Sequence, residues 1–206
     1  MYPPVDVSFF GEVPRRSVKR HGYLVVSALV PYKRVDLAVR WANASGEPLL
    51  VVGRGSELDK LKQLAGPCVT FKEDAERNDL RDAYRRARAL LFCGVEDFGI
   101  VPVEAMAAGC PVVAFGHGGA LETVVGTGSE KTGEFFSEST IESLGSAIER
   151  LEKNVKLGAF QPDVLLERAE MFSRIAFKKG LCDYFRALGF NLFSPTNRAV
   201  GTVSHP

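Results

Sequence analysis

The segment ALLFCGVEDFGIVPVEAMAAGCPVVAF, residues 89–115, alternates apolar strands with an apolar helix. Residues 89–92 and 112–115 are short, continuous apolar runs, and Pro102 suits the first turn of a helix between them. From 98 to 116 the only charged residue is Glu104, so a hydropathy window would flag a membrane span. Gly109-Cys110-Pro111 would break such a helix, and a lone carboxylate in hydrocarbon is costly. We therefore expect a buried helix, a turn and a buried strand in a soluble protein.

The same alternation extends outward on both sides of this segment. Further apolar runs occupy residues 23–26, 49–52, 69–71 and 134–136. None of them shows the alternation of apolar and polar residues that is typical of a sheet with one solvent-exposed face. Helical patterns separate them: Leu80, Ala83, Tyr84 and Ala87 share one face, and Ser139 with Glu142 predicts a capping box that opens a helix over 140–153. Strands alternating with helices predict an α/β fold, a Rossmann-like doubly wound parallel sheet.

The ends of the chain differ from this middle. Residues 1–21 contain three prolines and are predicted to form an extended linker or entry segment. Residues 22–189 are predicted to form one Rossmann-like domain with C-terminal helices, the last carrying an apolar stripe of Phe177, Leu181, Phe185 and Leu188. Residues 190–206 lack any hydrophobic period and are predicted to be a loose tail.

Composition excludes several classes of protein. The chain has 26 Lys and Arg against 25 Asp and Glu, a net charge of +1, which argues against a nucleic-acid binder. Its four cysteines form no CxxC pair, so we expect neither a disulfide framework nor a metal site. Four buried thiols and the lack of a signal peptide indicate a reducing, cytoplasmic location.

Three loops that follow predicted strands carry polar or glycine residues, at residues 27–34, 53–56 and 93–104. In a parallel α/β sheet such loops surround the ligand. Gly99 lets the backbone approach a ligand, and the free N–H groups of Gly99, Ile100 and Val101 at a helix start would bind phosphate. Glu104, among apolar residues, needs donors, which the hydroxyls of a ribose would supply.

Each of these residues also has a structural explanation, which taken singly is the stronger one. Glu96 and Asp97 suit any helix start, and Glu104 would pair with an internal Arg such as Arg88. Lys33 and Arg34 would be a solvated charged pair, and residues 53–55 would form a turn with a helix cap. His117 would be a loop residue and not a base.

Taken together, the motifs resemble one family. Residues 96–114, EDFGIVPVEAMAAGCPVVA, resemble the E-x(7)-E signature of family-four glycosyltransferases of the GT-B fold, with Glu96 and Glu104 as its glutamates. Blocks at residues 27–37, 51–55, 118–124, 132–136 and 168–173 agree in order and spacing, so the resemblance covers nearly all of 20–188. Within the family, the chain is most similar to bacterial mannosyltransferases of O-antigen and polysaccharide assembly.

The resemblance implies roles for individual residues. Lys33 would neutralise the diphosphate of a nucleoside diphosphate sugar, with Arg34 assisting, and Glu96 would bind a hydroxyl of the transferred sugar. The rest of the donor site would comprise Phe98, Gly99, Ile100, Val101 and Glu104, with Glu104 on the ribose. Such enzymes retain anomeric configuration and use no metal or cofactor, and GDP-mannose is the donor that the resemblance favours.

The sequence departs from the family pattern in three places. Ala28 stands where an Arg usually clamps phosphate, and Glu73 where a Gly usually follows the third strand. Residues 2–6 resemble the linker into the second half of a two-domain enzyme, so the N-terminal acceptor-binding half is missing. We expect this chain to be the donor-binding C-terminal domain of a retaining glycosyltransferase, inactive alone.

The intact enzyme would act on a glycan or lipid-linked acceptor and would meet the inner face of the membrane through the missing half. Two other functions stay open. One is a free-standing nucleotide-binding or regulatory module, and the other is a sugar-nucleotide epimerase that shares only the fold.

Overall fold

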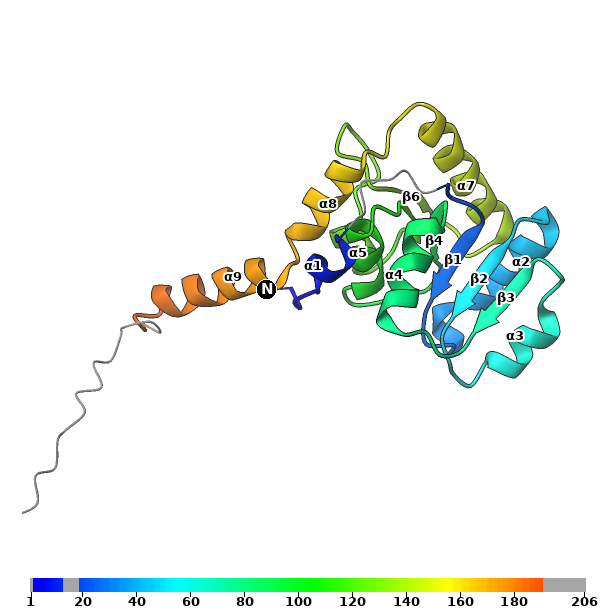
Figure 1. Ribbon diagram of the computed structural model, residues 1–206, viewed down its shortest axis with the longest axis horizontal. Coiled ribbons are helices and arrows are strands. Elements are labelled where there is room, and N and C mark those ends of the chain that lie inside the picture. Colours follow the sequence, from blue (N-terminus) through cyan, green and yellow to red (C-terminus); the bar gives the residue numbers. More distant parts are fainter. Residues whose placement is uncertain (1, 13–18, 191–206) are drawn as a thin grey trace, which may run out of the picture.

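The computed structural model describes residues 2–12 and 19–190 and contains a six-stranded, wholly parallel sheet (Figure 1). The strands follow the order β3-β2-β1-β4-β5-β6. Their bounds are β1 (Tyr23–Val26), β2 (Leu49–Val52), β3 (Val69–Lys72), β4 (Ala89–Phe92), β5 (Val112–Phe115) and β6 (Gly133–Phe136). The predicted doubly wound α/β sheet is confirmed.

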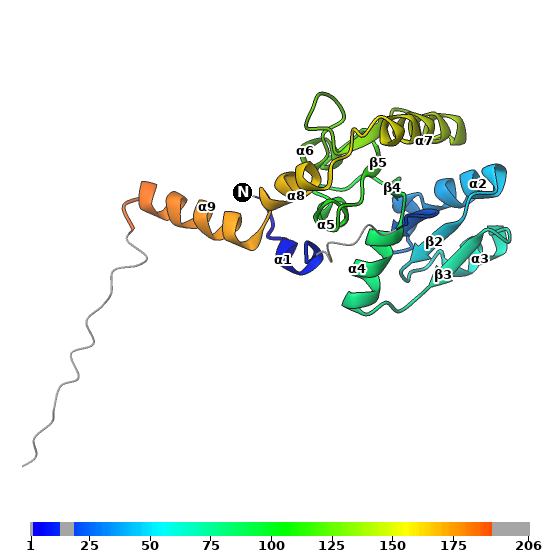
Figure 2. The same cartoon turned by 45° about the horizontal axis from the view of Figure 1, so that its top comes forward.

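Helices cover both faces of this sheet (Figures 1 and 2). Helices α2 (Val35–Ser45), α3 (Leu58–Leu64) and α7 (Ile141–Lys156) share a buried apolar cluster on one face. Helices α1 (Val7–Phe10), α4 (Arg77–Arg86), α5 (Ile100–Ala107) and α8 (Pro162–Glu170) share the cluster on the other. Two short elements, η1 (Pro31–Lys33) and α6 (Ala120–Thr123), follow β1 and β5, and α9 (Arg174–Ala187) extends away from the body.

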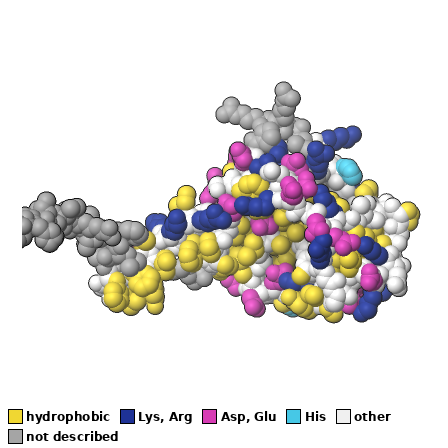
Figure 3. Space-filling view, turned by 60° about the horizontal axis from the view of Figure 1, so that its bottom comes forward, with side chains coloured by type: hydrophobic (Ala, Val, Ile, Leu, Met, Phe, Trp, Pro, Cys, Tyr) yellow, Lys and Arg dark blue, Asp and Glu magenta, His cyan; other side chains and the backbone are white. Residues whose placement is uncertain are grey.

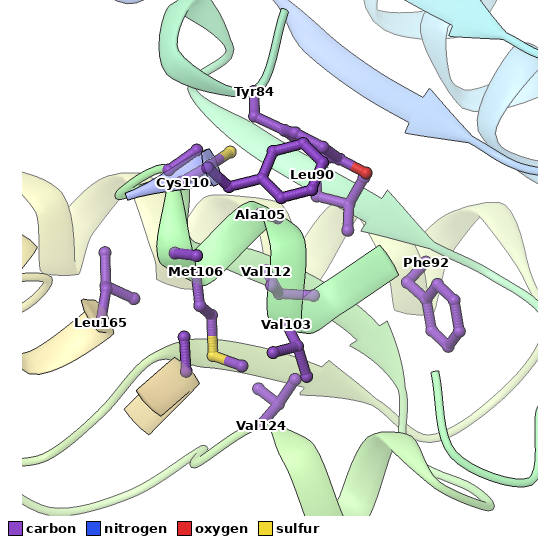
Figure 4. Close-up of a cluster of buried hydrophobic side chains, with 14 of the residues drawn as sticks. Tyr84, Leu90, Phe92, Val103, Ala105, Met106, Cys110, Val112, Val124 and Leu165 are labelled. Carbon is purple, nitrogen blue, oxygen red and sulfur yellow. The ribbon is translucent and has the colours of Figure 1, made fainter. Parts of the chain in front are cut away.

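The strands contribute side chains alternately to the two clusters. Leu24 and Leu90 face α5, whereas their neighbours Tyr23 and Leu91 face α2 and α7. Figure 4 shows the first cluster, with Leu90 and other buried side chains gathered around α5. Burying a side chain of this size stabilises the fold by about 1.5–3 kcal/mol, so the strands need apolar residues on both faces.

The entry segment is not wholly extended, because residues 7–10 form α1. Val7 and Phe10, three residues apart, are buried on the same side of α1, and the Phe10 ring meets the Tyr84 ring edge-on at 5.7 Å. Val5 donates its N–H to the carbonyl of Phe172 at 2.9 Å, which fastens the segment to the end of α8. Burial of α1 outweighs the extended preference that the flanking prolines indicate.

The predicted capping box at Ser139 was wrong by one residue. Thr140 is the N-cap of α7, and its side chain accepts from the Ser143 N–H at 3.2 Å. The Ser139 hydroxyl instead accepts from Nη1 of Arg34 at 2.7 Å. Ser and Thr both cap helices well, so the sequence pattern alone did not separate the two positions.

Some of the other sequence predictions agree with the structure, and others do not. Cys93 and Cys110 are buried, as expected, but Cys68 and Cys182 are partly exposed. The apolar stripe of residues 177–188 lies on and just beyond α9, where no side chain is fully buried. Residues 191–206 of the predicted loose tail lie outside the described residues. In the described part of the chain no helix combines the length and the apolar character needed to cross a bilayer, and α5 has only eight residues.

Candidate functional site

The candidate site lies where the strand order reverses. β1 pairs with both β2 and β4, although two strands separate β1 from β4 in the sequence. The loops that leave β1 and β4 therefore diverge, and a crevice at such a point is where open α/β sheets bind ligands. The loop after β1 contains Lys33, and the loop after β4 contains Glu96 and leads into α5.

Lys33 and Glu96 form an ion pair across this crevice. Lys33 ends η1, its N–H donating to the carbonyl of Val30 at 3.1 Å. Its ammonium pairs with Oε1 of Glu96 and lies 4.9 Å from the centroid of the Tyr32 ring. The Lys33 side chain is only 12% exposed and that of Glu96 23%. The fold thus brings together the two residues that the sequence nominated as catalytic.

An open hollow of about 520 Å³ adjoins this pair, and we call it the β1–β4 hollow. It is lined by most of the predicted site residues together with some neighbours: Pro3, Tyr32, Lys33, Val95, Glu96, Asp97, Phe98, Gly99, Ile100 and Val101. Among these lining residues Lys33 is the one cation, and it lines the same hollow as the first residues of α5.

The first turn of α5 is built to leave its N–H groups free. Gly99, the N-cap, has φ of +85°, a left-handed conformation that favours glycine, and no side chain caps the helix. The first N–H groups of a helix have no acceptor within it, and the helix dipole makes this end positive. Together with Lys33, this turn offers the β1–β4 hollow the chemistry of an anion site.

Neighbouring segments hold the loop after β4 in place. The Gly119 N–H, from the loop after β5, donates to the Glu96 carbonyl at 2.7 Å. The Phe98 ring stacks on Tyr2 at 5.4 Å between centroids and meets Phe172 edge-on at 5.4 Å. The loop with the predicted sugar-binding Glu96 is therefore tied to the entry segment and to the end of α8.

Glu104 lies one turn further along α5 and does not line the β1–β4 hollow. It is partly exposed, and its Oε2 accepts from the Tyr84 hydroxyl at 2.9 Å. Burial raises the pKa of Glu104 above its ordinary value, while the Tyr84 hydrogen bond and Arg77 pull it down. The alternative pairing with Arg88 is wrong, because Arg88 instead binds Glu47 and Glu152.

Arg34 is not among the residues that line the β1–β4 hollow. Arg34 has φ of +49° and donates to Asp36 at 3.1 Å and to Ser139 at 2.7 Å. Arg54, in the loop after β2, would be a second cation able to compensate for the Arg missing at Ala28, but it is paired with Asp74 on the surface. Lys33 therefore faces the hollow without the help of either arginine.

The remaining loop candidates have structural roles. Residues 53–56 form a turn in which the Arg54 carbonyl accepts from Leu29 N–H at 2.8 Å, which joins the loops after β1 and β2. Glu73 pairs with Lys62. The exposed ring of His117 lies against Phe115, 4.4 Å between centroids. Within residues 2–12 and 19–190, no three His, Cys, Asp or Glu side chains are grouped to hold a metal ion.

Sequence reasoning missed Tyr2, Pro3 and Tyr84 at or beside this site. Tyr84 was assigned to the apolar face of its helix, correctly, but nothing in the sequence indicated that its hydroxyl would reach Glu104, twenty residues away. Pro3 and Tyr2 lie in the predicted linker, where spacing carries no information about contacts. Only the packed entry segment places them next to Phe98.

A family model described as "Glycosyl transferases group 1" matches residues 10–161. A GDP-mannose-dependent α-(1-6)-phosphatidylinositol monomannoside mannosyltransferase of Mycobacterium tuberculosis is 31% identical over 163 residues, covering 68% of this chain and 42% of the relative. A D-inositol 3-phosphate glycosyltransferase of Mycobacteroides abscessus is 34% identical, covering 88% and 40%. The chain thus spans about two fifths of the length of these relatives.

Solved structures share the fold at lower identity. The Anabaena protein HepE in complex with UDP superposes with a TM-score of 0.74 at 20% identity, covering 89% of this chain and 56% of that one. The lipopolysaccharide outer core galactosyltransferase WaaB superposes with a TM-score of 0.70 at 20% identity, covering 90% and 55%. This chain corresponds in fold to about half of each.

Proposed function

The chain belongs to the group 1 family of glycosyl transferases, and we propose that it forms the donor-binding half of a retaining hexosyltransferase. The donor is a nucleoside diphosphate sugar, and the acceptor is a glycan or a lipid-linked glycan. The observation that carries this proposal is the Lys33–Glu96 pair beside the uncapped start of α5, at the point where the strand order reverses. This is where a diphosphate and the sugar attached to it would lie side by side.

In this proposal the parts of the site have separate tasks. Lys33 and the first N–H groups of α5 meet the charge that grows on the diphosphate as the glycosidic bond breaks, which lowers the barrier electrostatically. Glu96, on the same hollow, is placed to accept a hydrogen bond from a hydroxyl of the transferred sugar. Glu104 holds the hydroxyls of the ribose. No metal enters this scheme, since Lys33 and the helix dipole supply the positive charge.

The names of the relatives support mannose as the transferred sugar. The Mycobacterium tuberculosis relative is named as GDP-mannose-dependent, and a Salmonella typhimurium relative, 29% identical over 109 residues, is named as an O-antigen chain mannosyltransferase. We therefore propose GDP-mannose as the donor. Lipid-linked acceptors would place the complete enzyme at the cytoplasmic face of a membrane, with contact made by the half that this chain does not contain.

Calorimetry on the purified chain tests the donor role. The chain is titrated with GDP, UDP, ADP and GDP-mannose in buffer without magnesium, with inorganic pyrophosphate and free mannose as controls. We expect GDP-mannose to bind more tightly than pyrophosphate, and free mannose not to bind measurably. Absence of binding by every nucleoside diphosphate at millimolar concentration would contradict the donor role.

A further inference from the structure

Tyr84 and Glu104 face each other from two different helices. Tyr84 lies on α4 and is fully buried, with 0% of its surface exposed. Its hydroxyl donates to Oε2 of Glu104 on α5 at 2.9 Å. Apart from Ile100 and Val101 at its start, α5 has only one side chain that is not buried, and that side chain is Glu104. A carboxylate in such a place has few neighbours that can fix its direction.

The Tyr84 ring cannot turn away from this contact. It is enclosed in the apolar cluster around α5 (Figure 4). It also meets the Phe10 ring edge-on, with 5.7 Å between the ring centroids. A buried phenol that loses its hydrogen-bond partner pays the full desolvation cost of the hydroxyl. Both the packing and the hydrogen bond therefore hold the hydroxyl on Oε2.

We propose that Tyr84 is a positioning residue for Glu104: its hydroxyl fixes Oε2 and leaves Oε1 of the carboxylate to receive the ligand. Among the described residues, no hydrogen bond to Oε1 competes for it. The carboxylate is thus fixed before the ligand arrives, and less rotamer entropy is lost on binding. The identity of that ligand as a ribose rests on the proposed function, whereas the action of Tyr84 on Glu104 does not.

The same contact favours the ionised form of Glu104. Burial raises the pKa of the Glu104 carboxyl, the Tyr84 hydrogen bond and the charge of Arg77 lower it, and the charge of Asp6 raises it. Burial also raises the pKa of Tyr84 well above its ordinary value, so the phenol remains a donor throughout the accessible pH range. Arg77 is itself paired with Asp6, which also meets Arg174, and Cys110 is a further titratable group near Tyr84. Tyr84 is therefore the neutral donor that favours the charged form of Glu104.

The first experiment needs no ligand. Carbon-13 NMR follows the Glu104 carboxyl through a pH titration in the wild type and in Tyr84→Phe, which keeps the ring and removes the hydroxyl. We expect the midpoint to rise by about one pH unit, the scale of a lost hydrogen bond to a charged group. Tyr23→Phe is the matched control, because the buried Tyr23 also donates to a glutamate, Glu152, at 2.8 Å. An unchanged midpoint in Tyr84→Phe would overturn the proposal.

The second experiment separates this inference from the proposed function. Calorimetry measures the affinities for a nucleoside diphosphate and for pyrophosphate at pH 6, 7 and 8. The pyrophosphate series shows how much of the pH dependence comes from titration of the phosphate groups. In Tyr84→Phe we expect the nucleoside diphosphate to bind more weakly by up to about tenfold, with the larger loss at pH 6, partial recovery at pH 8 and pyrophosphate unaffected. A raised Glu104 midpoint with unchanged nucleotide affinity would uphold Tyr84 as the positioning residue and remove Glu104 from the ribose role.

A reciprocal measurement covers the case in which Tyr84→Phe does not fold. In the wild type, the Tyr84 hydroxyl proton is expected as a downfield resonance that exchanges slowly with water, because the hydroxyl is buried against a carboxylate. Glu104→Gln keeps the shape of the acceptor but removes its charge, so the resonance should move upfield. A resonance that does not respond to Glu104→Gln would contradict the contact.

Discussion

At the residue scale, the Lys33–Glu96 ion pair neutralises the one cation among the described residues that line the hollow before any ligand binds. Lys33 is only 12% exposed, so leaving its ammonium without a partner would be costly. A diphosphate that enters the β1–β4 hollow must share Lys33 with Glu96 or displace it. The pair therefore links anion binding to the carboxylate that is predicted to contact the sugar.

Removing the Lys33 charge should weaken diphosphate binding more than removing the neighbouring positive charge does. Lys33→Ala is expected to lose about 1.5–3 kcal/mol of nucleoside diphosphate binding, the range for a hydrogen bond to a charged group. Arg34→Ala is the matched control: Arg34 is the next residue and also cationic, but its guanidinium is held by Asp36 and Ser139. Calorimetry on both variants decides the matter. An equal loss in both would mean that general positive charge, not the position of Lys33, binds the anion.

Removing the Glu96 charge should change the affinities for two ligands differently. Glu96→Gln frees Lys33, so a bare nucleoside diphosphate should bind more tightly by about 1 kcal/mol, roughly fivefold in Kd. The full sugar nucleotide should gain less or bind more weakly, because the amide is a poorer acceptor for a sugar hydroxyl. The measurement is a pair of titrations without magnesium. Equal changes in affinity for both ligands would mean that Glu96 only stabilises the loop and does not contact the sugar.

The limits of sequence reasoning are also clearest at the residue scale. The chain order places Lys33 and Glu96 after two strands, and a parallel sheet brings such loops to one edge, so their proximity was predictable. The direction of Arg34 was not, because it depends on a left-handed conformation at φ of +49°. The Tyr84–Glu104 hydrogen bond was not predictable either, because it joins two helices and the apolar periodicity identifies Tyr84 only as a core residue.

At the element scale, the strands were predicted to within one residue because most of them are continuous apolar runs. The structure extends β3 by Lys72 and begins β6 at Gly133, one residue beyond the prediction in each case. Helix starts were harder, as the shift from Ser139 to Thr140 shows. Helix α1 was missed because its four residues are too few to show a period. Burial against α5 and Tyr84, which is a tertiary effect, makes it helical.

The contact between the loops after β4 and β5 can be tested with glycine substitutions. A Cβ at Gly119 would lie 2.3 Å from Cα of Phe98, although the backbone of Gly119, with φ of −62°, would accept alanine. Gly119→Ala should therefore force the Phe98 loop outward, cost about 1–3 kcal/mol of unfolding free energy and weaken diphosphate binding.

Gly145→Ala is the control for this prediction. Gly145 lies within α7, and its added Cβ would meet Trp41 at ordinary contact distances of 3.5–3.6 Å. This substitution should be neutral or stabilise the protein by up to about 1 kcal/mol. Urea unfolding and calorimetry are run on both variants. If Gly119→Ala lost stability but kept full affinity, the loop after β5 would not shape the β1–β4 hollow.

At the scale of the whole molecule, α9 differs from the other long helices. None of its residues is buried, Ile175 is 78% exposed and Tyr184 is 57% exposed. Figure 3 shows hydrophobic side chains along one side of the extension and Lys and Arg along another. Large exposed apolar patches generally mark interaction surfaces, and α9 is the described helix that most resembles one.

The last prediction concerns what this chain does alone. The sheet is covered on both faces by two buried clusters, so the chain should fold by itself and unfold in urea in one cooperative step. It should bind the donor but transfer no sugar, because transfer requires an acceptor held in line with the donor, and the β1–β4 hollow is open.

The assay incubates GDP-mannose and lipid-linked or free glycan acceptors with the chain alone, and with the chain fused behind an acceptor-binding half from a relative. Product in the fusion but not in the single chain, and its loss with Lys33→Ala, is the expected result. Transfer by the single chain would show that the acceptor site lies within these 206 residues. Donor binding without transfer even in the fusion would favour a nucleotide-binding regulatory module.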